Sequence, residues 1–348
     1  MSWLTPAAGD HLLLAETDID ASVLLGRRIA VLGYGSQGRA QALSLRDGGW
    51  SVRVGVRAGG PSEARAREDG IDHGDPLEVA RWGNVVMMLV PDEHQPALLD
   101  CVAAALEPGD AVGFAHGFNV TYDRAVFPAG VRVFLVAPCA PGARLREAFE
   151  AGKGVFAYVA VRDGDDDTLP LALAYALAIG CARAGVLTTT FREETEVDLF
   201  GEQAVLCGGL HALLTAGYET LVDAGYSAEM AYLETLHQIV WLAATIQREG
   251  IAGTRRLISS TARYGDVTRG SRIIGAESKQ AFRDLLEEIR SGAFADEFSN
   301  ESRRGFADLR RNLERLDRHP MEEVGSRLRE RLARQAAVAP ETSQGSGG

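Results

Sequence analysis

The sequence has few of the features of a secreted or nucleic-acid-binding protein. Its 348 residues include only four cysteines, Cys101, Cys139, Cys181 and Cys207, with no CxxC pair. This spacing favours reduced thiols over a disulfide framework or a zinc site. Acidic residues outnumber basic ones, giving a formal net charge of −12. Because phosphate backbones attract basic surfaces, this charge argues against a nucleic-acid partner.

Long apolar runs are also scarce. We find no run of the ~18 apolar residues that a membrane-spanning helix needs, so no membrane partner is expected. Residues 1–20 show no basic segment followed by an apolar one, which argues against a signal peptide. We therefore expect a cytoplasmic protein. The negative charge still allows an anionic small-molecule substrate, because a local arginine or metal site can override it.

The first half of the chain alternates short apolar runs with helical patterns such as Gln37–Asp47 and Glu93–Leu106. This alternation predicts an α/β Rossmann-like domain over residues 1–189, with a parallel sheet covered by helices on both faces. The predicted strands are Arg28–Leu32, Ser51–Val56, Asn84–Val90, Ala111–Ala115, Val131–Val136 and Gly154–Val161.

The pattern changes near Glu193, where strand-like runs end and long helical segments follow one another. The clearest segments are Glu194–Asp223, Ala228–Arg248 and Ser278–Ser291. We predict an all-α domain over residues 190–335. The remaining residues, 336–348, are rich in Ala, Pro, Ser and Gly and are predicted to form a disordered tail.

A glycine-rich turn follows the first predicted strand and precedes a helix. Its glycines fit the GxGxxG pattern of a dinucleotide-binding turn, in which the helix N-terminus binds the pyrophosphate. Gly33 permits the tight turn, Gly35 lets the backbone approach the pyrophosphate, and Gly38 lets the helix pack on the strand. The predicted cofactor-binding residues of this turn are Gly33, Tyr34, Gly35, Ser36, Gln37 and Gly38.

The end of the second predicted strand indicates the choice of cofactor. Arg57 stands where an NAD-specific site has a carboxylate for the ribose 2′-hydroxyl, and a cation there favours the 2′-phosphate of NADPH. Ser62 is predicted to add a hydrogen bond. The alternative is that Arg57 is a solvated loop residue.

Acidic residues at helical spacing mark the second domain. Asp198 and Glu202 are four residues apart and would share one face of a helix. The small and apolar residues 204–209 predict that this face is buried, where two carboxylates repel unless they share a proton or a divalent cation. Oxygen ligands of this kind suit Mg²⁺. Glu234 lies in another apolar helix. The alternative is a solvated acidic face.

Several longer motifs resemble those of the short-form (class I) ketol-acid reductoisomerase family. The likeness extends from about residue 28 to residue 330. Its motifs are GYGSQG (Gly33–Gly38), PDEHQ (Pro91–Gln95), FAHGFN (Phe114–Asn119), ETEVDLFGEQAVLCGG (Glu194–Gly209), AYLETLH (Ala231–His237), STARYGD (Ser260–Asp266) and HPMEEVG (His319–Gly325).

The resemblance implies an NADPH- and Mg²⁺-dependent enzyme that acts on a 2-hydroxy-3-keto acid of the acetolactate type. Such an enzyme moves an alkyl group and then reduces the product, in the biosynthesis of branched-chain amino acids. The resemblance also implies a knotted helical domain that forms a homodimer, or a higher oligomer, and binds metal and substrate.

The resemblance assigns roles to individual residues. Asp198 would bridge two Mg²⁺ ions, Glu202 would bind one, and Glu234 would come from the partner chain. Ser259 and Glu234 would contact substrate, and His116 would line the cofactor and substrate sites and take part in catalysis with Asp198 and Glu202. The remaining cofactor contacts would be Asp92, Gln95 and Gly142.

Three positions depart from the family pattern. Cys139 replaces a lysine beside the substrate, Ala143 replaces a histidine, and Gln238 replaces a second glutamate. Glutamine is neither an anionic ligand nor a carboxylic acid, so the charge near the metals changes. Cys139 is interpreted as a small neutral side chain, with a nucleophile as the alternative.

These departures leave three hypotheses. The first is a reductoisomerase-like oxidoreductase with an altered substrate in a specialised biosynthetic route. The second is an acyloin-acid isomerase without net redox chemistry. The third is a non-catalytic homologue that binds the cofactor, although three retained acids argue against it.

Overall fold

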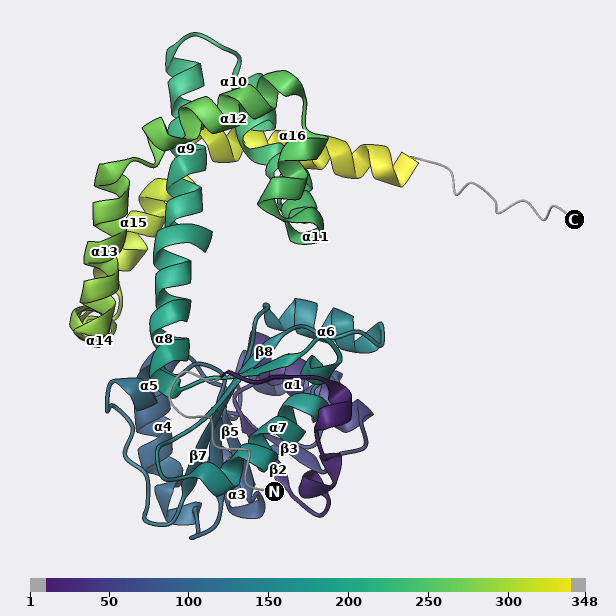
Figure 1. Ribbon diagram of the computed structural model, residues 1–348. Coiled ribbons are helices and arrows are strands. Elements are labelled where there is room, and N and C mark those ends of the chain that lie inside the picture. The colour runs from purple at the N-terminus through teal and green to yellow at the C-terminus, as the bar shows by residue number, and fades with distance from the viewer. Residues whose placement is uncertain (1–10, 339–348) are drawn as a thin grey trace, which may run out of the picture. The chain divides into compact units, whose positions relative to one another are not determined.

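The computed structural model describes residues 11–338, which belong to two compact units, Met1–Asp198 and Leu199–Gly348 (Figure 1). Of the predicted disordered tail, residues 336–338 end the last helix and the others lie outside the described residues. Each unit is described by itself below.

A nine-stranded sheet forms the centre of the first unit, in the order β1-β9-β8-β7-β6-β5-β2-β3-β4. All six predicted strands are present, and the sequence missed only the short β1, β4 and β9. The strands are β1 Leu13–Leu14, β2 Ile29–Leu32, β3 Val52–Gly55, β4 His73–Gly74, β5 Val85–Met88, β6 Ala111–Phe114, β7 Arg132–Pro138, β8 Ala157–Val161 and β9 Val186–Thr188.

The prediction of a parallel sheet is wrong for two strand pairs toward the β1 edge of the sheet. Strands β2 to β7 are parallel, but β8 is antiparallel to β7, with Ala137 opposite Tyr158, and β1 is antiparallel to β9. After β7 the chain forms helix α6 (Gly142–Glu150), which packs on α1 (Ser36–Asp47). Because α6 lies against α1, the chain re-enters the sheet beside the end of β7, with Ala157 opposite Pro138. Strand β8 therefore runs antiparallel to β7.

Alternating residues of the central strands face two separate cores. Ile29 and Val31 of β2 join the core formed with α1 and α7, whereas Ala30 and Leu32 join the core formed with α3 and α4. The helices of this unit are α1, α2 Pro61–Glu68, α3 Pro76–Trp82, α4 Gln95–Val102, α5 Phe118–Thr121, α6, α7 Leu169–Ala178 and the first part of α8 Phe191–Phe200.

The order of the strands reverses between β2 and β5. The connection after β2 leads through α1 to β3 on one side, whereas β5 lies on the other side of β2. In open α/β sheets, ligands bind outside the carboxyl ends of the strands at such a reversal. The glycine-rich turn after β2 lies at this point.

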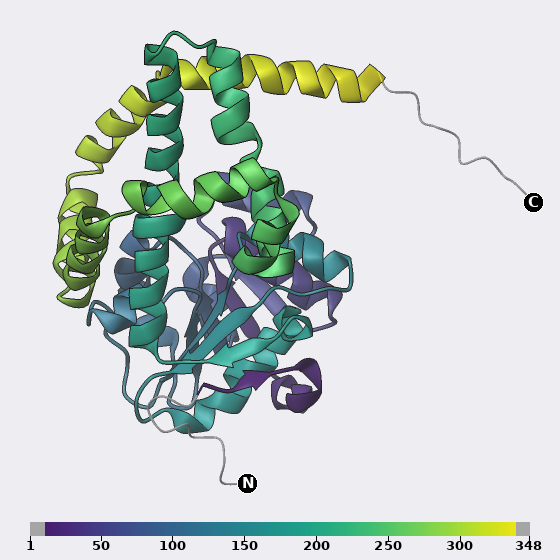
Figure 2. The same ribbon diagram turned by 45° about the horizontal axis from the view of Figure 1, so that its top comes forward.

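The second unit is helical throughout its described residues. A small core joins Tyr218 of α9, Ala231 and Tyr232 of α10, and Met321 and Val324 of α16, and Figure 2 shows α16 in yellow beside the other two helices. The helices are α9 Gly208–Asp223, α10 Ala228–Tyr232, α11 Ile239–Leu257, α12 Ser260–Ile273, α13 Ala276–Arg290, α14 Ala293–Arg303, α15 Ala307–Asp317 and α16 Pro320–Val338.

Two helices of the second unit contain π-helical turns, and α11 contains a kink. The π-helical segments are η7 (Gly201–Leu206), before α9, and η8 (Leu233–His237), between α10 and α11. Gly250 interrupts α11 with a positive φ of 70°. Single π-helical turns are rare and occur often at functional sites.

One helical run passes a length-and-composition test for a membrane span, although it contains no uninterrupted apolar run of about 18 residues. By length and composition, the run Phe191–Asp223 could cross a bilayer, and little of it is buried. Counting consecutive apolar residues misses this run because polar and small residues interrupt it, although an 18-residue window within it contains at most two charged side chains. One such helix is weak evidence for a membrane, since exposed helices that pair with another chain have the same composition.

Candidate active site

The glycine-rich turn has the geometry of a dinucleotide-binding turn. Gly33 has a positive φ of 104°, and a Cβ there would lie 2.7 Å from the Leu89 carbonyl oxygen. A Cβ on Gly38 would overlap the Gly33 carbonyl oxygen, so the helix packs against the strand only with glycine. Gly35 is exposed and has open space on its Cβ side, beside the N-terminus of α1. The open side of Gly35 and the helix N-terminus fit a pyrophosphate.

Ser36 and Gln37 hold a second loop against this turn. The Ser36 hydroxyl accepts a hydrogen bond from the Gly142 amide (3.1 Å), and the Gln37 side chain donates to the Ala140 carbonyl (2.9 Å). A Cβ on Gly142 would overlap the Ser36 backbone. The loop that contains Cys139 is thereby fixed beside the predicted cofactor turn.

His116 links two acidic residues beyond the ends of β5 and β6. Its Nδ1 lies 2.7 Å from an Asp92 carboxylate oxygen, and its Nε2 lies 3.5 Å from an Asp198 oxygen without forming a hydrogen bond. Burial lowers the pKa of His116, but the Asp92 hydrogen bond and the charges of Asp92, Glu194 and Asp198 raise it further, to about 9. The imidazole is therefore a cation at neutral pH. The structure thus brings together three residues that the sequence had singled out.

Glu194 is a member of this group that the sequence analysis did not single out. It is 5% exposed and accepts a hydrogen bond from the Gly117 amide (3.0 Å). Burial raises its pKa to about 7, although the His116 charge opposes the shift. Burial also raises the pKa of Asp198. The sequence feature that could have identified Glu194 is its position four residues, or one helical turn, before Asp198.

The predicted cofactor contacts Asp92 and Gln95 differ in their surroundings. Gln95 is buried, and its amide nitrogen donates to the Val90 carbonyl (3.1 Å) and to the Asp92 carboxylate (3.0 Å). Its amide oxygen accepts from the Asn119 side chain (2.8 Å). Gln95 therefore holds Asp92 in place from within the protein. Asp92 itself is partly exposed and contacts His116.

Cys139, at the end of β7, is paired with a tyrosine. The thiol hydrogen-bonds with the hydroxyl of Tyr158 on β8. Burial raises the pKa of the Cys139 thiol, an effect that the Tyr158 hydrogen bond partly offsets and the charges of Asp198 and Glu194 reinforce. A protonated thiol fits the interpretation of Cys139 as a neutral side chain rather than a nucleophile. Tyr158 was not among the residues predicted from the sequence.

The predicted 2′-phosphate contacts lie at the N-terminal end of α2. Arg57 is exposed just after β3, and its carbonyl accepts a hydrogen bond from the Gly60 amide (3.3 Å). Ser62 is half-buried in the first turn of α2. The exposed guanidinium is accessible to an anionic ligand.

The predicted metal ligands of the second unit lie in the two π-helical turns. Glu202 is in η7 and Glu234 is in η8, and both are exposed. The expected burial of the face that follows Asp198 is wrong within a single chain, because Val205 is 50% exposed and Leu206 is 65% exposed. The helix has little of its own unit to pack against at these residues.

Ser259, the predicted substrate contact, is also the N-cap of α12. Its exposed hydroxyl accepts a hydrogen bond from the Ala262 amide (3.2 Å). The hydroxyl hydrogen remains available as a donor.

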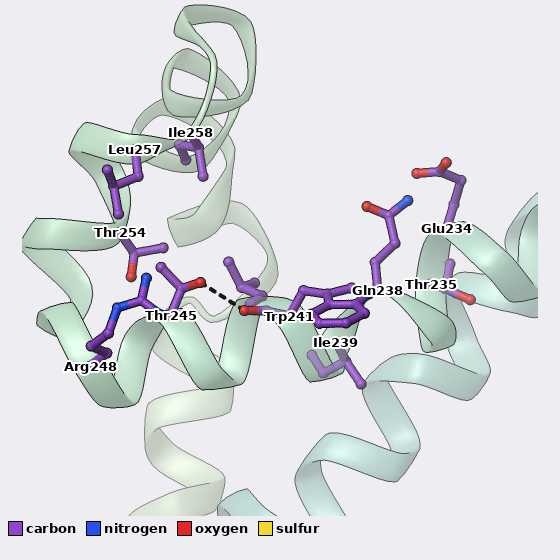
Figure 3. Close-up of a pocket in the computed structure, with 11 residues that line it drawn as sticks. Glu234, Thr235, Gln238, Ile239, Trp241, Thr245, Arg248, Thr254, Leu257 and Ile258 are labelled. Atoms are coloured by element: carbon purple, nitrogen blue, oxygen red, sulfur yellow. Dashed lines mark hydrogen bonds between the residues drawn. The ribbon is translucent and has the colours of Figure 1, made fainter. Parts of the chain in front are cut away.

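A cavity of about 530 Å³ in the second unit contains Glu234 and Gln238 together (Figure 3). Arg248 and Thr254 line another part of the same cavity, and the indole of Trp241 lies between the two groups in this view. Gln238, at the position where the resemblance implies a second glutamate, thus lies in the same cavity as Glu234.

Residues 11–338 of one chain contain no group of three or more His, Cys, Asp or Glu side chains that could hold a metal ion. The carboxylates of Asp198, Glu202 and Glu234 are nevertheless the oxygen donors that Mg²⁺ prefers. Asp198 belongs to the first unit, whereas Glu202 and Glu234 belong to the second.

Two family models match the chain, one for each unit. Residues 23–185 match "Acetohydroxy acid isomeroreductase, NADPH-binding domain", and residues 191–334 match "Ketol-acid reductoisomerase, C-terminal domain".

Full-length relatives agree with these matches. The chain is 46% identical to the ketol-acid reductoisomerase (NADP(+)) of Saccharopolyspora erythraea, over 90% of this chain and 95% of the relative. It is 43% identical to that of an Arthrobacter species (strain FB24), over 90% and 93%. A solved NADH-preferring ketol-acid reductoisomerase from an uncultured archaeon superposes with a TM-score of 0.89 at 40% identity, covering 92% of this chain and 98% of that one. The chain therefore belongs to the ketol-acid reductoisomerase family of oxidoreductases.

Proposed function

We propose that the protein is an NADPH- and Mg²⁺-dependent enzyme that rearranges and reduces a 2-hydroxy-3-keto acid of the acetolactate type. The observation that carries this proposal is the Asp92–His116–Asp198 arrangement, with Nδ1 2.7 Å and Nε2 3.5 Å from the two carboxylates. It lies beyond the carboxyl ends of the strands, in the unit that contains the dinucleotide-binding turn. Ligands of open α/β sheets bind outside the carboxyl ends of the strands, so these charged groups lie on the side of the sheet where the cofactor would bind.

The chain's own residues have separate tasks in this proposal. Arg57 and Ser62 bind the 2′-phosphate, and the turn from Gly33 to Gly38 binds the pyrophosphate. Asp198, Glu202 and Glu234 hold Mg²⁺, which supplies Lewis-acid polarisation of the ketone and the neighbouring hydroxyl. His116, held by Asp92, places its Nε2 beside Asp198 and the substrate, and Ser259 donates to the substrate carboxylate.

The assembly that we propose is a homodimer in the cytoplasm, in which Glu234 of one copy completes the site of the other. The exposed apolar residues of the second unit support this assembly, because Trp241 is 69% exposed and Val267 is 64% exposed. Large exposed apolar patches mark interaction sites. Burial against a second copy also accounts for the apolar run Phe191–Asp223 without a membrane.

We further propose that the substrate differs from 2-acetolactate. Cys139, Ala143 and Gln238 remove a cation, an imidazole and an anion from the site that the family builds, and Tyr158 places a hydroxyl beside Cys139. A site that has exchanged charged groups for neutral ones prefers a substrate with a different charge or hydrogen-bonding pattern.

The test is an assay of the purified protein with Mg²⁺, NADPH and a panel of acyloin acids that includes 2-acetolactate. We expect loss of NADPH absorbance together with a 2,3-dihydroxy acid product for one member of the panel. A rearranged product without NADPH consumption would favour an isomerase. Absence of any product, with NADPH bound, would favour a non-catalytic homologue.

A further inference from the structure

A buried tyrosine connects the dinucleotide-binding turn to a neighbouring helix. Tyr34, between Gly33 and Gly35, is 1% exposed, so its side chain does not face the cofactor. Its hydroxyl donates a hydrogen bond to an Asp69 carboxylate oxygen at 2.9 Å. Asp69 is the C-cap of α2. The turn that receives the pyrophosphate is therefore hydrogen-bonded to the helix that follows the next strand.

The same carboxylate is bound by the helix that begins at the turn. Arg39 of α1 donates to both Asp69 oxygens, each at 2.7 Å, and Arg46 of α1 donates to the Asp69 carbonyl at 2.7 Å. Bidentate, charge-assisted hydrogen bonds of this kind are among the stronger ones in proteins. The Arg39 hydrogen bond lowers the pKa of Asp69, with a further contribution from Tyr34. Asp69 therefore remains ionised and retains all of its partners at neutral pH.

The position of Asp69 gives this contact a consequence for the cofactor. Helix α2 has eight residues, so its opposite end lies about 12 Å from Asp69. That opposite end contains Ser62 and follows Arg57, the proposed 2′-phosphate contacts. Whatever fixes α2 against α1 thus also fixes the distance between the two anion sites.

We propose that Tyr34, Arg39 and Asp69 act as positioning residues that set the spacing between the pyrophosphate turn and the 2′-phosphate site. This proposal rests on the proposed use of NADPH. A ligand that contacts both sites gains affinity from a fixed spacing, because its second contact forms within the complex already made by the first. A ligand that contacts one site gains nothing from that spacing.

The test compares the affinity for NADPH, which contacts both sites, with the affinity for 2′-AMP, which contacts the 2′-phosphate site alone. Dissociation constants are measured by calorimetry for NADPH and for 2′-AMP with the wild type, Asp69→Ala and Tyr34→Phe. We expect Asp69→Ala to weaken NADPH about tenfold and Tyr34→Phe to weaken it about threefold, with 2′-AMP changed less than about twofold in both. At saturating NADPH, kcat of Asp69→Ala is expected to remain at the wild-type value while its KM for NADPH rises.

Asp72→Ala is the matched control. Asp72 lies three residues further along, and its carboxylate pairs with Arg53 at 2.9 Å. Its side chain is 63% exposed. We expect wild-type affinity for both ligands. If Asp69→Ala fails to fold, Tyr34→Phe carries the test, because it removes a single oxygen atom.

Two results would overturn the proposal. One is an Asp69→Ala variant that binds NADPH as tightly as the wild type. The other is an equal loss of affinity for NADPH and 2′-AMP, which would indicate local damage to the 2′-phosphate site. A wild type that binds no NADPH would instead refute the proposed cofactor, and this inference with it.

Discussion

The two units differ in how deeply each buries its proposed site residues. In the first unit, His116, Asp92, Glu194 and Gln95 have their partners within the unit and are partly or wholly buried. In the second unit, the proposed site residues Glu202, Glu234 and Ser259 are exposed, and much of the apolar surface is uncovered. The site residues of the first unit are therefore held within that unit, whereas those of the second are exposed in it and are completed by another chain in the dimer that we propose.

Within one chain, the proposed site residues of the first unit are held more firmly than those of the second. The cofactor turn and the imidazole of His116 are held by strands and hydrogen bonds, and Asp198 lies 3.5 Å from that imidazole. The remaining carboxylates lie on π-helical turns at an exposed surface.

Removal of the Asp198 carboxylate, the proposed metal ligand in the first unit, should abolish the metal-dependent reaction. We expect Asp198→Ala to lower kcat roughly a thousandfold, because the proposed bridging ligand is lost. NADPH affinity should remain close to that of the wild type, since the turn is unaffected. Turnover near the wild-type level would refute the assignment of Asp198 as a metal ligand.

Mixed assemblies should recover part of this activity. Asp198→Ala and Glu234→Ala disable different halves of a shared site, so a mixed dimer keeps one site in which both residues are intact. Equimolar mixing after reversible dissociation should restore about a quarter of wild-type activity, because half of the dimers are mixed and each has one intact site of two. No recovery in confirmed mixed dimers would show that each site belongs to one chain.

Introducing the lysine and the glutamate that the resemblance implies at positions 139 and 238 should shift the substrate preference toward 2-acetolactate. The double variant Cys139→Lys, Gln238→Glu is expected to raise kcat/KM for 2-acetolactate about tenfold or more, because the lysine stabilises negative charge and the glutamate is an anionic ligand. Cys139→Met is the control, since it fills the space without a charge. An unchanged rate would mean that other residues of the cavity determine the substrate.

Removal of the proposed 2′-phosphate contact should change the cofactor preference. We expect Arg57→Ala to weaken NADPH about tenfold while NADH binding changes little, because only NADPH carries the additional phosphate. Parallel fluorescence titrations with the two cofactors measure this ratio. Equal weakening of both cofactors would place Arg57 outside the 2′-phosphate site.

The buried Glu194 should make stability depend on pH in the first unit. Its folded-state pKa of about 7 exceeds its unfolded value, so the folded state binds more protons and unfolding becomes easier as pH rises from about 4.5 to 7. Relative to Glu194→Gln, the wild type should lose on the order of 2 kcal/mol over this range. Urea unfolding at pH 5.0 and 6.5 avoids most of the titration of His116. If the free energies of unfolding of the wild type and Glu194→Gln change equally between pH 5.0 and 6.5, the raised pKa of Glu194 is contradicted.

The sequence predicted what depends on local pattern. The strands of the first unit, the turn from Gly33 to Gly38 and the helical second half follow from periodicity and glycine spacing, and all are present. His116 and Asp198 were singled out separately, and the structure brings them together.

What the sequence could not predict depends on contacts between distant segments. The antiparallel β8 follows from the packing of α6 on α1, and the Tyr158–Cys139 pair follows from that strand pairing. Exposure of Val205 and Leu206 was missed because an apolar pattern does not say which chain covers it.

The two π-helical turns make the chain sensitive to its length at two places. Each turn has a residue more than an α-helix needs for the same rise, so deletion of one residue from Gly201–Leu206 would let the helix rewind regularly. The helix on either side of the turn would then keep nearly its present orientation, whereas the residues within the turn, including Glu202, would be displaced. A shortened chain would gain a more regular helix and point its glutamates elsewhere, so natural variation in length should fall in loops and spare these two turns.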